Sequence, residues 1–252
     1  MRCPKCEFEQ PAINTECVAC GLIFEKYQAH QQKKTGPPAD SDNPVIFYTD
    51  QPTTFFEYFR HFILHVKPEE SPLVVWSRVG FFVILFIWGV KFIFTPFETG
   101  YAMNSVWHLI NLPFHEAGHI FFRPFGRLIT SLGGSLGQLL MPLICMLVFL
   151  IKTRDTFAAA FCLWWLGENF MDLAPYINDA KALVMPLLGG NTGRTSPYGF
   201  HDWEFILKET GLINHYHEIA ITAHAMGIIF MLGAFLWGGY ILYKQLKQLR
   251  SQ

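Results

Sequence analysis

The sequence predicts a mainly α-helical membrane protein: a polytopic transmembrane bundle of four to five spanning helices behind a small N-terminal zinc ribbon. Of its 252 residues, 51% are hydrophobic and only 15% are charged, against roughly a quarter charged in ordinary soluble domains. Several apolar stretches approach the roughly 20 residues that a helix needs to cross a bilayer. Four of the six cysteines gather near the N-terminus, which predicts a separate small metal-binding unit.

The cysteine cluster has the spacing of a zinc ribbon. Cys3 and Cys6 form one C-x2-C pair, and Cys17 and Cys20 form another. Two intervening residues let one tight turn direct both thiolates at the same ion, and four thiolates complete a tetrahedral structural Zn²⁺ site. Residues 1–10 lack the apolar core of a signal peptide. We therefore expect a reducing, cytoplasmic location, where zinc binding is favoured over the alternative of two disulfides or a redox pair.

Four stretches have the length and composition of membrane spans: 73–94, 128–151, 157–177 and 219–243. A fifth stretch, 103–122, is long enough to cross but contains three histidines and a glutamate, which are costly in lipid unless they face a cavity, a metal or each other. If it crosses fully, five basic loop residues share the side of the N-terminus; if it is re-entrant, five others do. The positive-inside rule therefore leaves both topologies open.

Within that fifth stretch, residues 115–119 read HEAGH and match the HExxH motif. His115 and His119 lie four residues apart, so a helix places both imidazoles on one face, where they can bind Zn²⁺. Glu116 lies between them, as a general base for water at the metal requires. The competing interpretation is that these are polar residues packed between helices, but three ionisable residues within five positions of a membrane segment favour a bound metal.

A catalytic zinc site needs a third protein ligand and an open position for water. Three carboxylates in the segment 164–181 (WWLGENFMDLAPYINDAK) are candidates: Glu168, Asp172 and Asp179. The segment resembles the second motif of the site-2 protease family of intramembrane metalloproteases, in which an N-x-x-P stretch ends in an aspartate followed by a small residue. The resemblance covers roughly residues 100–185 and implies Asp179 as the third ligand. The spacing from Pro175 is one residue shorter than the family's, so Asp172 and then Glu168 remain candidates.

The resemblance implies an intramembrane zinc metalloprotease that hydrolyses peptide bonds of membrane-embedded substrates, with Glu116 as the catalytic base and one catalytic Zn²⁺ besides the structural ion of the ribbon. The alternative is a non-catalytic zinc-binding membrane protein, either a carrier or an inactive protease-like scaffold. A carrier would spread ionisable groups along a path across several helices. In this sequence the ionisable groups concentrate at one depth of the predicted membrane domain, which favours the metalloprotease over a carrier.

We thus expect a zinc ribbon at 1–27, a linker and interfacial helix at 28–72, and a transmembrane metalloprotease-like domain at 73–252. The predicted ribbon resembles the short zinc ribbons found at the N-terminus of many bacterial membrane and regulatory proteins. We therefore expect a location in the bacterial inner membrane, with a cytoplasmic N-terminus. Expected partners are the lipid bilayer, a membrane protein or peptide substrate, and a cytoplasmic partner of the ribbon. A net charge of -1 offers nucleic acid no general attraction.

A further polar set follows the third apolar stretch. It could supply hydrogen-bond partners for ligand histidines, or substrate contacts, but we favour the simpler interpretation of solvated loop and interfacial residues. The set comprises His201, Asp202, Trp203, His215, His217 and His224. Residues 133–135 and the loop 186–200 are further candidates for holding substrate.

Overall fold

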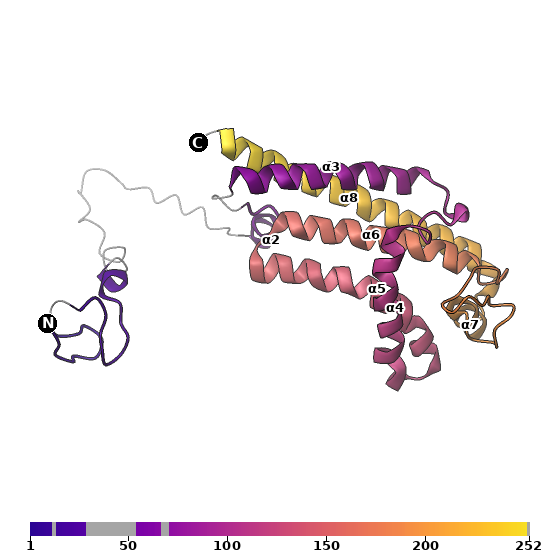
Figure 1. Cartoon of the computed structure of the whole chain (residues 1–252), viewed down its shortest axis with the longest axis horizontal. Coiled ribbons are helices and arrows are strands. Elements are labelled where there is room, and N and C mark those ends of the chain that lie inside the picture. The colour runs from indigo at the N-terminus through magenta and orange to yellow at the C-terminus, as the bar shows by residue number, and fades with distance from the viewer. Residues whose placement is uncertain (12–13, 29–53, 67–70, 251–252) are drawn as a thin grey trace. The chain divides into compact units, whose positions relative to one another are not determined.

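The computed structural model describes residues 1–11, 14–28, 54–66 and 71–250 (Figure 1). The chain divides into two compact units, Met1–Gln51 and Pro52–Gln252, and each is described by itself. Over the described residues the fold is mainly helical and contains isolated β-bridges in place of strands. This confirms the predicted helical class.

Among the described residues, the second unit contains seven α-helices and several short 3-10 and π-helical turns. The helices are α2 (Phe55–Ile63), α3 (Pro72–Phe94), α4 (Val106–Phe122), α5 (Arg127–Val148), α6 (Thr156–Asn178), α7 (Asp202–Glu209) and α8 (Tyr216–Arg250). The shorter turns are η1 (Phe97–Thr99), η2 (Arg123–Phe125), η3 (Phe149–Thr153) and η4 (Ile213–His215). α3, α6 and α8 run side by side, whereas α4 lies across their direction (Figure 1).

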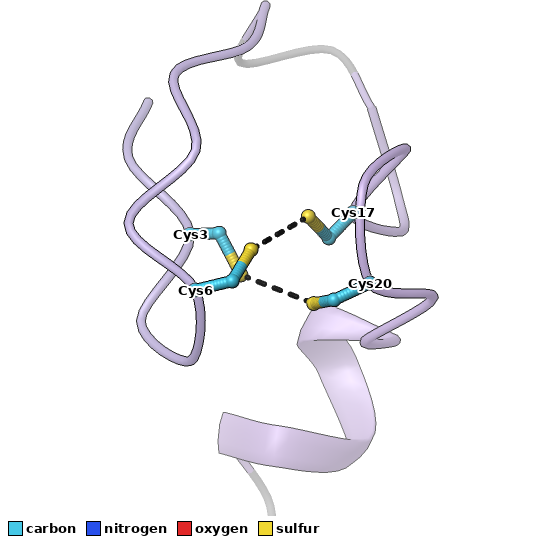
Figure 2. A group of neighbouring side chains, drawn as sticks. All are labelled: Cys3, Cys6, Cys17 and Cys20. Carbon is cyan, nitrogen blue, oxygen red and sulfur yellow. Dashed lines mark hydrogen bonds between the residues drawn. The ribbon is translucent and has the colours of Figure 1, made fainter.

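The first unit is built from two matching turns that each carry a cysteine pair (Figure 2). In each turn the backbone N–H after the second cysteine bonds to the carbonyl of the first: Glu7 to Cys3 at 2.9 Å, and Gly21 to Cys17 at 2.8 Å. Both residues have positive φ, 59° at Glu7 and 68° at Gly21. Glycine adopts this conformation without strain, which explains Gly21.

Three helical segments in the described part of the chain are long and apolar enough to cross a membrane: Pro72–Phe94, Arg127–Thr153 and Ile213–Arg250. The predicted span at 157–177 forms α6, which packs chiefly against α8 and is buried along nearly its whole length. At about 1.5 Å per residue it is long enough to cross, but buried Glu168, Asn169 and Asp172 make it less apolar. The count of four to five crossings therefore stays a prediction.

Local sequence explains where the central helices begin. The Asp155 side chain caps α6 by accepting the backbone N–H of Ala158 at 3.1 Å, and it also accepts a 2.7 Å hydrogen bond from Arg78 of α3. One carboxylate therefore satisfies a free helix donor and ties two helices together. At the start of α4, the Ser105 hydroxyl accepts the backbone N–H of Trp107 at 3.2 Å.

Glycines bring α4 and α5 into close contact. A Cβ on Gly118, inside the HExxH motif, would overlap the backbone of Gly133, and a Cβ on Gly137 would overlap the carbonyl oxygen of Phe114. Small residues at helix interfaces allow backbones to approach in this way. The α4–α5 contact fixes the helix face that carries the two motif histidines.

A linker and an interfacial helix are predicted at 28–72. Residues 29–53 and 67–70 lie outside the described part of the chain, and the described residues between them include α2, with the exposed aromatic side chains Phe55, Phe56 and Phe59. The end of α2 is tied to the bundle, because Trp237 of α8 donates a 3.0 Å hydrogen bond to the Ile63 carbonyl.

Candidate functional site

Two groups of side chains in the described residues could hold a metal ion. The first is the four-cysteine cluster, whose sulfurs converge (Figure 2). Cys3 Sγ lies 3.7 Å from Cys20 Sγ, and Cys6 Sγ lies 3.6 Å from Cys17 Sγ. Zn–S bonds of about 2.3 Å in a tetrahedral site would space the sulfurs about 3.8 Å apart. The cluster could therefore bind a metal ion such as zinc, as the spacing predicts.

The second group comprises His115 and His119 of α4 and Asp202 of α7. The Nε2 atoms of His115 and His119 lie 3.2 Å and 3.3 Å, respectively, from Asp202 Oδ2. Tetrahedral bonds of about 2.0–2.1 Å to nitrogen and oxygen would space such ligand atoms about 3.3 Å apart. Both distances to the carboxylate oxygen thus match the separation of two ligand atoms around one zinc ion, and the three ligand atoms lie within 4.8 Å of one another.

A hydrogen bond at Nδ1 fixes the orientation of each imidazole. His115 Nδ1 lies 2.7 Å from the Gln138 side-chain oxygen, and His119 Nδ1 lies 2.8 Å from the Thr130 carbonyl oxygen. Both partners are acceptors, so each Nδ1 donates and each neutral ring directs the Nε2 lone pair toward Asp202. Two lone pairs and a carboxylate oxygen repel one another unless a cation lies between them. Histidine ligands of zinc show the same support by a carbonyl or carboxylate.

Asp202 is the first residue of α7, and Tyr176 of α6 holds it. The Tyr176 hydroxyl donates to Asp202 Oδ2 at 3.1 Å and accepts the Asp202 backbone N–H at 3.1 Å. Burial alone would raise the pKa of Asp202, but the hydrogen bonds that His115 and His119 donate from Nε2 when their rings are protonated outweigh it and lower the pKa to about 2. The side chain therefore stays a carboxylate, the form that binds metal.

Gly134 forms the wall of the site on α5. A Cβ at this position would lie 2.5 Å from His119 Nε2 and would also overlap His115 Nε2. It would occupy the space between the two nitrogens where an ion would bind. Glycine is therefore the residue that leaves this space open.

The site opens into a cavity of about 530 Å³ between α4, α5, α6 and the segment before α7. Glu116 lines the same cavity as His115, His119 and Asp202. Polar groups at the base and apolar walls around them are typical of ligand pockets. Arg127, Tyr176 and Leu187 lie among the other lining residues.

The structure places Asp179, the first-ranked third ligand, elsewhere. Its oxygens accept backbone N–H groups from Val184 at 3.0 Å and Met185 at 2.9 Å, and Oδ2 lies 3.4 Å from His201 Nε2. Asp179 follows the last residue of α6, where its carboxylate closes the turn that leaves the helix. Asp202, and not Asp179, is the carboxylate that lies beside both motif histidines.

The other two candidates also lie apart from the motif histidines. Asp172 pairs with His108, and Glu168 accepts a 2.8 Å hydrogen bond from Asn111. Both are on α6, nearer the start of that helix than Tyr176. They therefore face residues that precede the HExxH motif on α4.

From the sequence, Asp202 is expected to be a solvated loop residue, with support of a ligand histidine or contact with substrate as the alternatives. The signal that could have identified it is HDWEFIL: a capping residue, acidic residues in the first turn and apolar residues after them, which predict a helix start. His201 does cap α7, accepting the backbone N–H of Glu204 at 3.2 Å, and Trp203 donates to Ser135 of α5 at 3.2 Å. Both contacts hold α7, and with it Asp202, in place.

The remaining sequence candidates have separate positions. His217 Nδ1 lies 2.9 Å from the Asn178 side-chain oxygen, and the His224 ring lies 5.5 Å from that of Phe97. His215 lies in η4 and is exposed. None of them lines the cavity, whereas Pro186 and Phe200 of the loop 186–200 do.

Comparison with known proteins found no matching family model, no matching curated protein and no matching solved structure. The residues of the site themselves are therefore the basis for a functional conclusion.

Proposed function

We propose that this protein is an intramembrane zinc metallopeptidase, with His115, His119 and Asp202 as metal ligands and Glu116 as the general base. The observation that carries the proposal is the convergence of two Nε2 atoms and one carboxylate oxygen, 3.2 Å and 3.3 Å apart, beside a glutamate in a cavity. Three protein ligands with an open fourth position are typical of catalytic zinc sites.

A zinc ion held there would supply a Lewis acid that polarises the scissile carbonyl and makes bound water more acidic. The residues of the chain perform the remaining steps. Glu116 takes the proton from the water as the water oxygen bonds to the carbonyl carbon, and it then delivers that proton to the amide nitrogen, so the C–N bond breaks and the amine leaves. Asp202, His115 and His119 stay in place because Tyr176, Gln138 and the Thr130 carbonyl hold them.

The surroundings of the site favour a membrane-embedded peptide as the substrate. The cavity lies in the unit that contains the three segments able to cross a membrane, and its walls include Leu112, Leu173 and Leu188. A helical substrate has its carbonyls hydrogen-bonded within the helix, so it must unwind locally before one of them can be attacked.

The test uses the full-length protein in detergent and synthetic peptides of about 20 apolar residues with a central glycine pair. We expect Glu116→Gln to lower cleavage by at least about 100-fold while both candidate centres retain zinc. Asp202→Asn should lose the zinc of the second centre and cleavage together. Glu218→Gln, which changes an exposed carboxylate on α8, serves as the matched control.

Peptide products are measured by mass spectrometry, and zinc by elemental analysis. Cleavage by Glu116→Gln at the rate of the unchanged protein would contradict the assigned base. A zinc-loaded protein that cleaves none of the peptides would instead support the non-catalytic alternative.

A further inference from the structure

A second polar pair lines the cavity that contains the proposed metal site. His108 of α4 and Asp172 of α6 contribute to its wall, as do His115 and Glu116. The HExxH chemistry does not use them. Their neighbours in that part of the wall include the apolar side chains of Met103, Leu112 and Leu173.

Asp172 holds the His108 ring in one orientation. His108 Nδ1 lies 3.0 Å and 3.1 Å from the two carboxylate oxygens of Asp172, so Nδ1 carries a proton and donates it to the carboxylate. The structure gives His108 Nε2 no hydrogen bond to any described residue. In the neutral ring this nitrogen is an acceptor.

A buried network fixes Asp172 in turn. Asn111 donates to Asp172 Oδ2 at 3.3 Å and to Glu168 Oε2 at 2.8 Å, while its own oxygen accepts the Trp165 indole N–H at 2.8 Å. Asn111, Glu168 and Asp172 are 1%, 0% and 3% exposed, whereas the His108 side chain is 25% exposed. Within this network of described residues, the histidine end is therefore the part open to a ligand in the cavity.

The position of His108 relates it to the proposed scissile bond. His108 precedes His115 by two helical turns on the same face of α4, which corresponds to about 10 Å along the helix. An extended peptide advances about 3.3 Å per residue. A peptide bound with its scissile carbonyl at the metal site would thus reach His108 about three residues from the cleaved bond.

We propose that His108 is a substrate-binding residue whose Nε2 accepts a hydrogen bond from a hydroxyl or amide side chain about three residues from the cleaved bond. Asp172 is the positioning residue that keeps Nε2 directed into the cavity. This inference rests on the proposed peptidase function, because it takes the metal site as the place of cleavage. His108 Nε2 gives specificity because it is an acceptor without a partner in an apolar part of the wall. A substrate without a hydrogen-bond donor at that position would leave Nε2 unsatisfied.

The experiment uses apolar peptides of leucine, alanine and a central glycine pair, with one serine moved stepwise along the chain and an all-alanine control. We expect the cleaved bond to stay about three residues from the serine and to move with it. The serine peptides should be cleaved about threefold to tenfold more efficiently than the alanine peptide, as one hydrogen bond allows.

His108→Phe should abolish both effects and leave the zinc content unchanged, and Asp172→Asn should weaken them. His215→Phe, which changes an exposed histidine in η4, is the matched control. If cleavage in His108→Phe still follows the serine, or if this variant slows serine and alanine peptides equally, the assignment is wrong.

Binding of the same fluorescently labelled peptides to Glu116→Gln separates this inference from the proposed function. The unchanged protein could cleave none of the peptides while Glu116→Gln binds the serine peptides more tightly than the alanine peptide. If His108→Phe removes that preference, the result would retain His108 as a binding residue and reject the peptidase function. Equal binding of serine and alanine peptides would reject the role of His108 even if cleavage occurs.

Discussion

At the scale of single residues, the proposed metal site depends as much on one absent side chain as on its ligands. His115 and His119 are directed by acceptors at Nδ1, and Asp202 by Tyr176. Gly134 contributes no side chain, yet it borders the space that the three ligand atoms leave among themselves. One set of residues thus orients the ligand atoms, and a different residue, Gly134, leaves the space between them open.

Gly134→Ala should therefore exclude the ion without removing a ligand. The added methyl group would lie 2.5 Å from His119 Nε2 and would overlap His115 Nε2. We expect zinc to fall from two ions per chain to one, with cleavage lost. Gly80→Ala is the control, since nothing lies within 4 Å of a Cβ placed there. Retention of both ions by Gly134→Ala in elemental analysis would show that the ion binds elsewhere.

At the scale of elements, the segment between α6 and α7 leads to the proposed third ligand, Asp202 at the start of α7, and Asp179 organises this segment. Burial alone would raise the pKa of Asp179, but hydrogen bonds from His201 and from the backbone N–H groups of Met185 and Val184 lower it below its usual 3.8. The folded pKa is thus below the unfolded one. The carboxylate stabilises the segment above about pH 4, and that contribution is lost as the pH falls through the folded value.

Asp179→Asn should loosen this segment at pH 7 by roughly 1–3 kcal/mol, the usual effect of removing a hydrogen-bonded charge. The difference from the unchanged protein should shrink as the pH falls from about 4 through the folded pKa of Asp179, below which both side chains are neutral. Hydrogen exchange of residues 180–200 measures the effect, with Glu218→Gln as control. Equal hydrogen-exchange protection of Asp179→Asn and the unchanged protein at pH 7 would contradict the role of Asp179 in organising the segment. A loss of zinc from Asp179→Asn as large as the loss from Asp202→Asn would also contradict it.

The elements explain which parts of the site the sequence could predict. HExxH is a local pattern, and helix geometry alone places His115 and His119 on one face. Asp202 lies 87 residues after His115, and its approach depends on how the loop before α7 folds, which no periodicity encodes. Asp179 and Asp202 are both acids after a helical stretch. Only the contacts of His201 and Tyr176 distinguish the acid that closes the turn from the acid that faces the imidazoles.

Hydrophobic content predicted the helical fold but not the number of crossings. Pro72–Phe94 and Ile213–Arg250 are apolar enough to be recognised from composition. α6 is equally well formed but carries Glu168, Asn169 and Asp172, which other helices cover. Burial by protein, which composition does not report, makes these polar residues tolerable.

At the scale of the whole molecule, the chain combines two units with separate candidate metal sites. The four-cysteine cluster lies in a unit too small to bury a sufficient core, so metal binding and folding should be one event there. The second centre belongs to a unit whose helices pack extensively without it. Loss of metal should therefore affect the two units differently.

Cys6→Ser should remove the ion of the first unit and unfold the two cysteine-bearing turns while the helical unit keeps its zinc and its thermal stability. The measurements are zinc content, protease sensitivity near the N-terminus and thermal unfolding of the helices. Cys145→Ala, which alters a half-buried cysteine of α5, is the control. Loss of zinc from both centres in Cys6→Ser would contradict the independence of the two units.

The late position of Asp202 has a consequence for biosynthesis. A ribosome makes the chain from its N-terminus, so all four cysteines of the first centre emerge before any helix of the bundle has been translated. Asp202 emerges only after α3, α4, α5 and α6. On the proposed function, a newly made chain therefore lacks a complete peptidase centre until Asp202 has been translated.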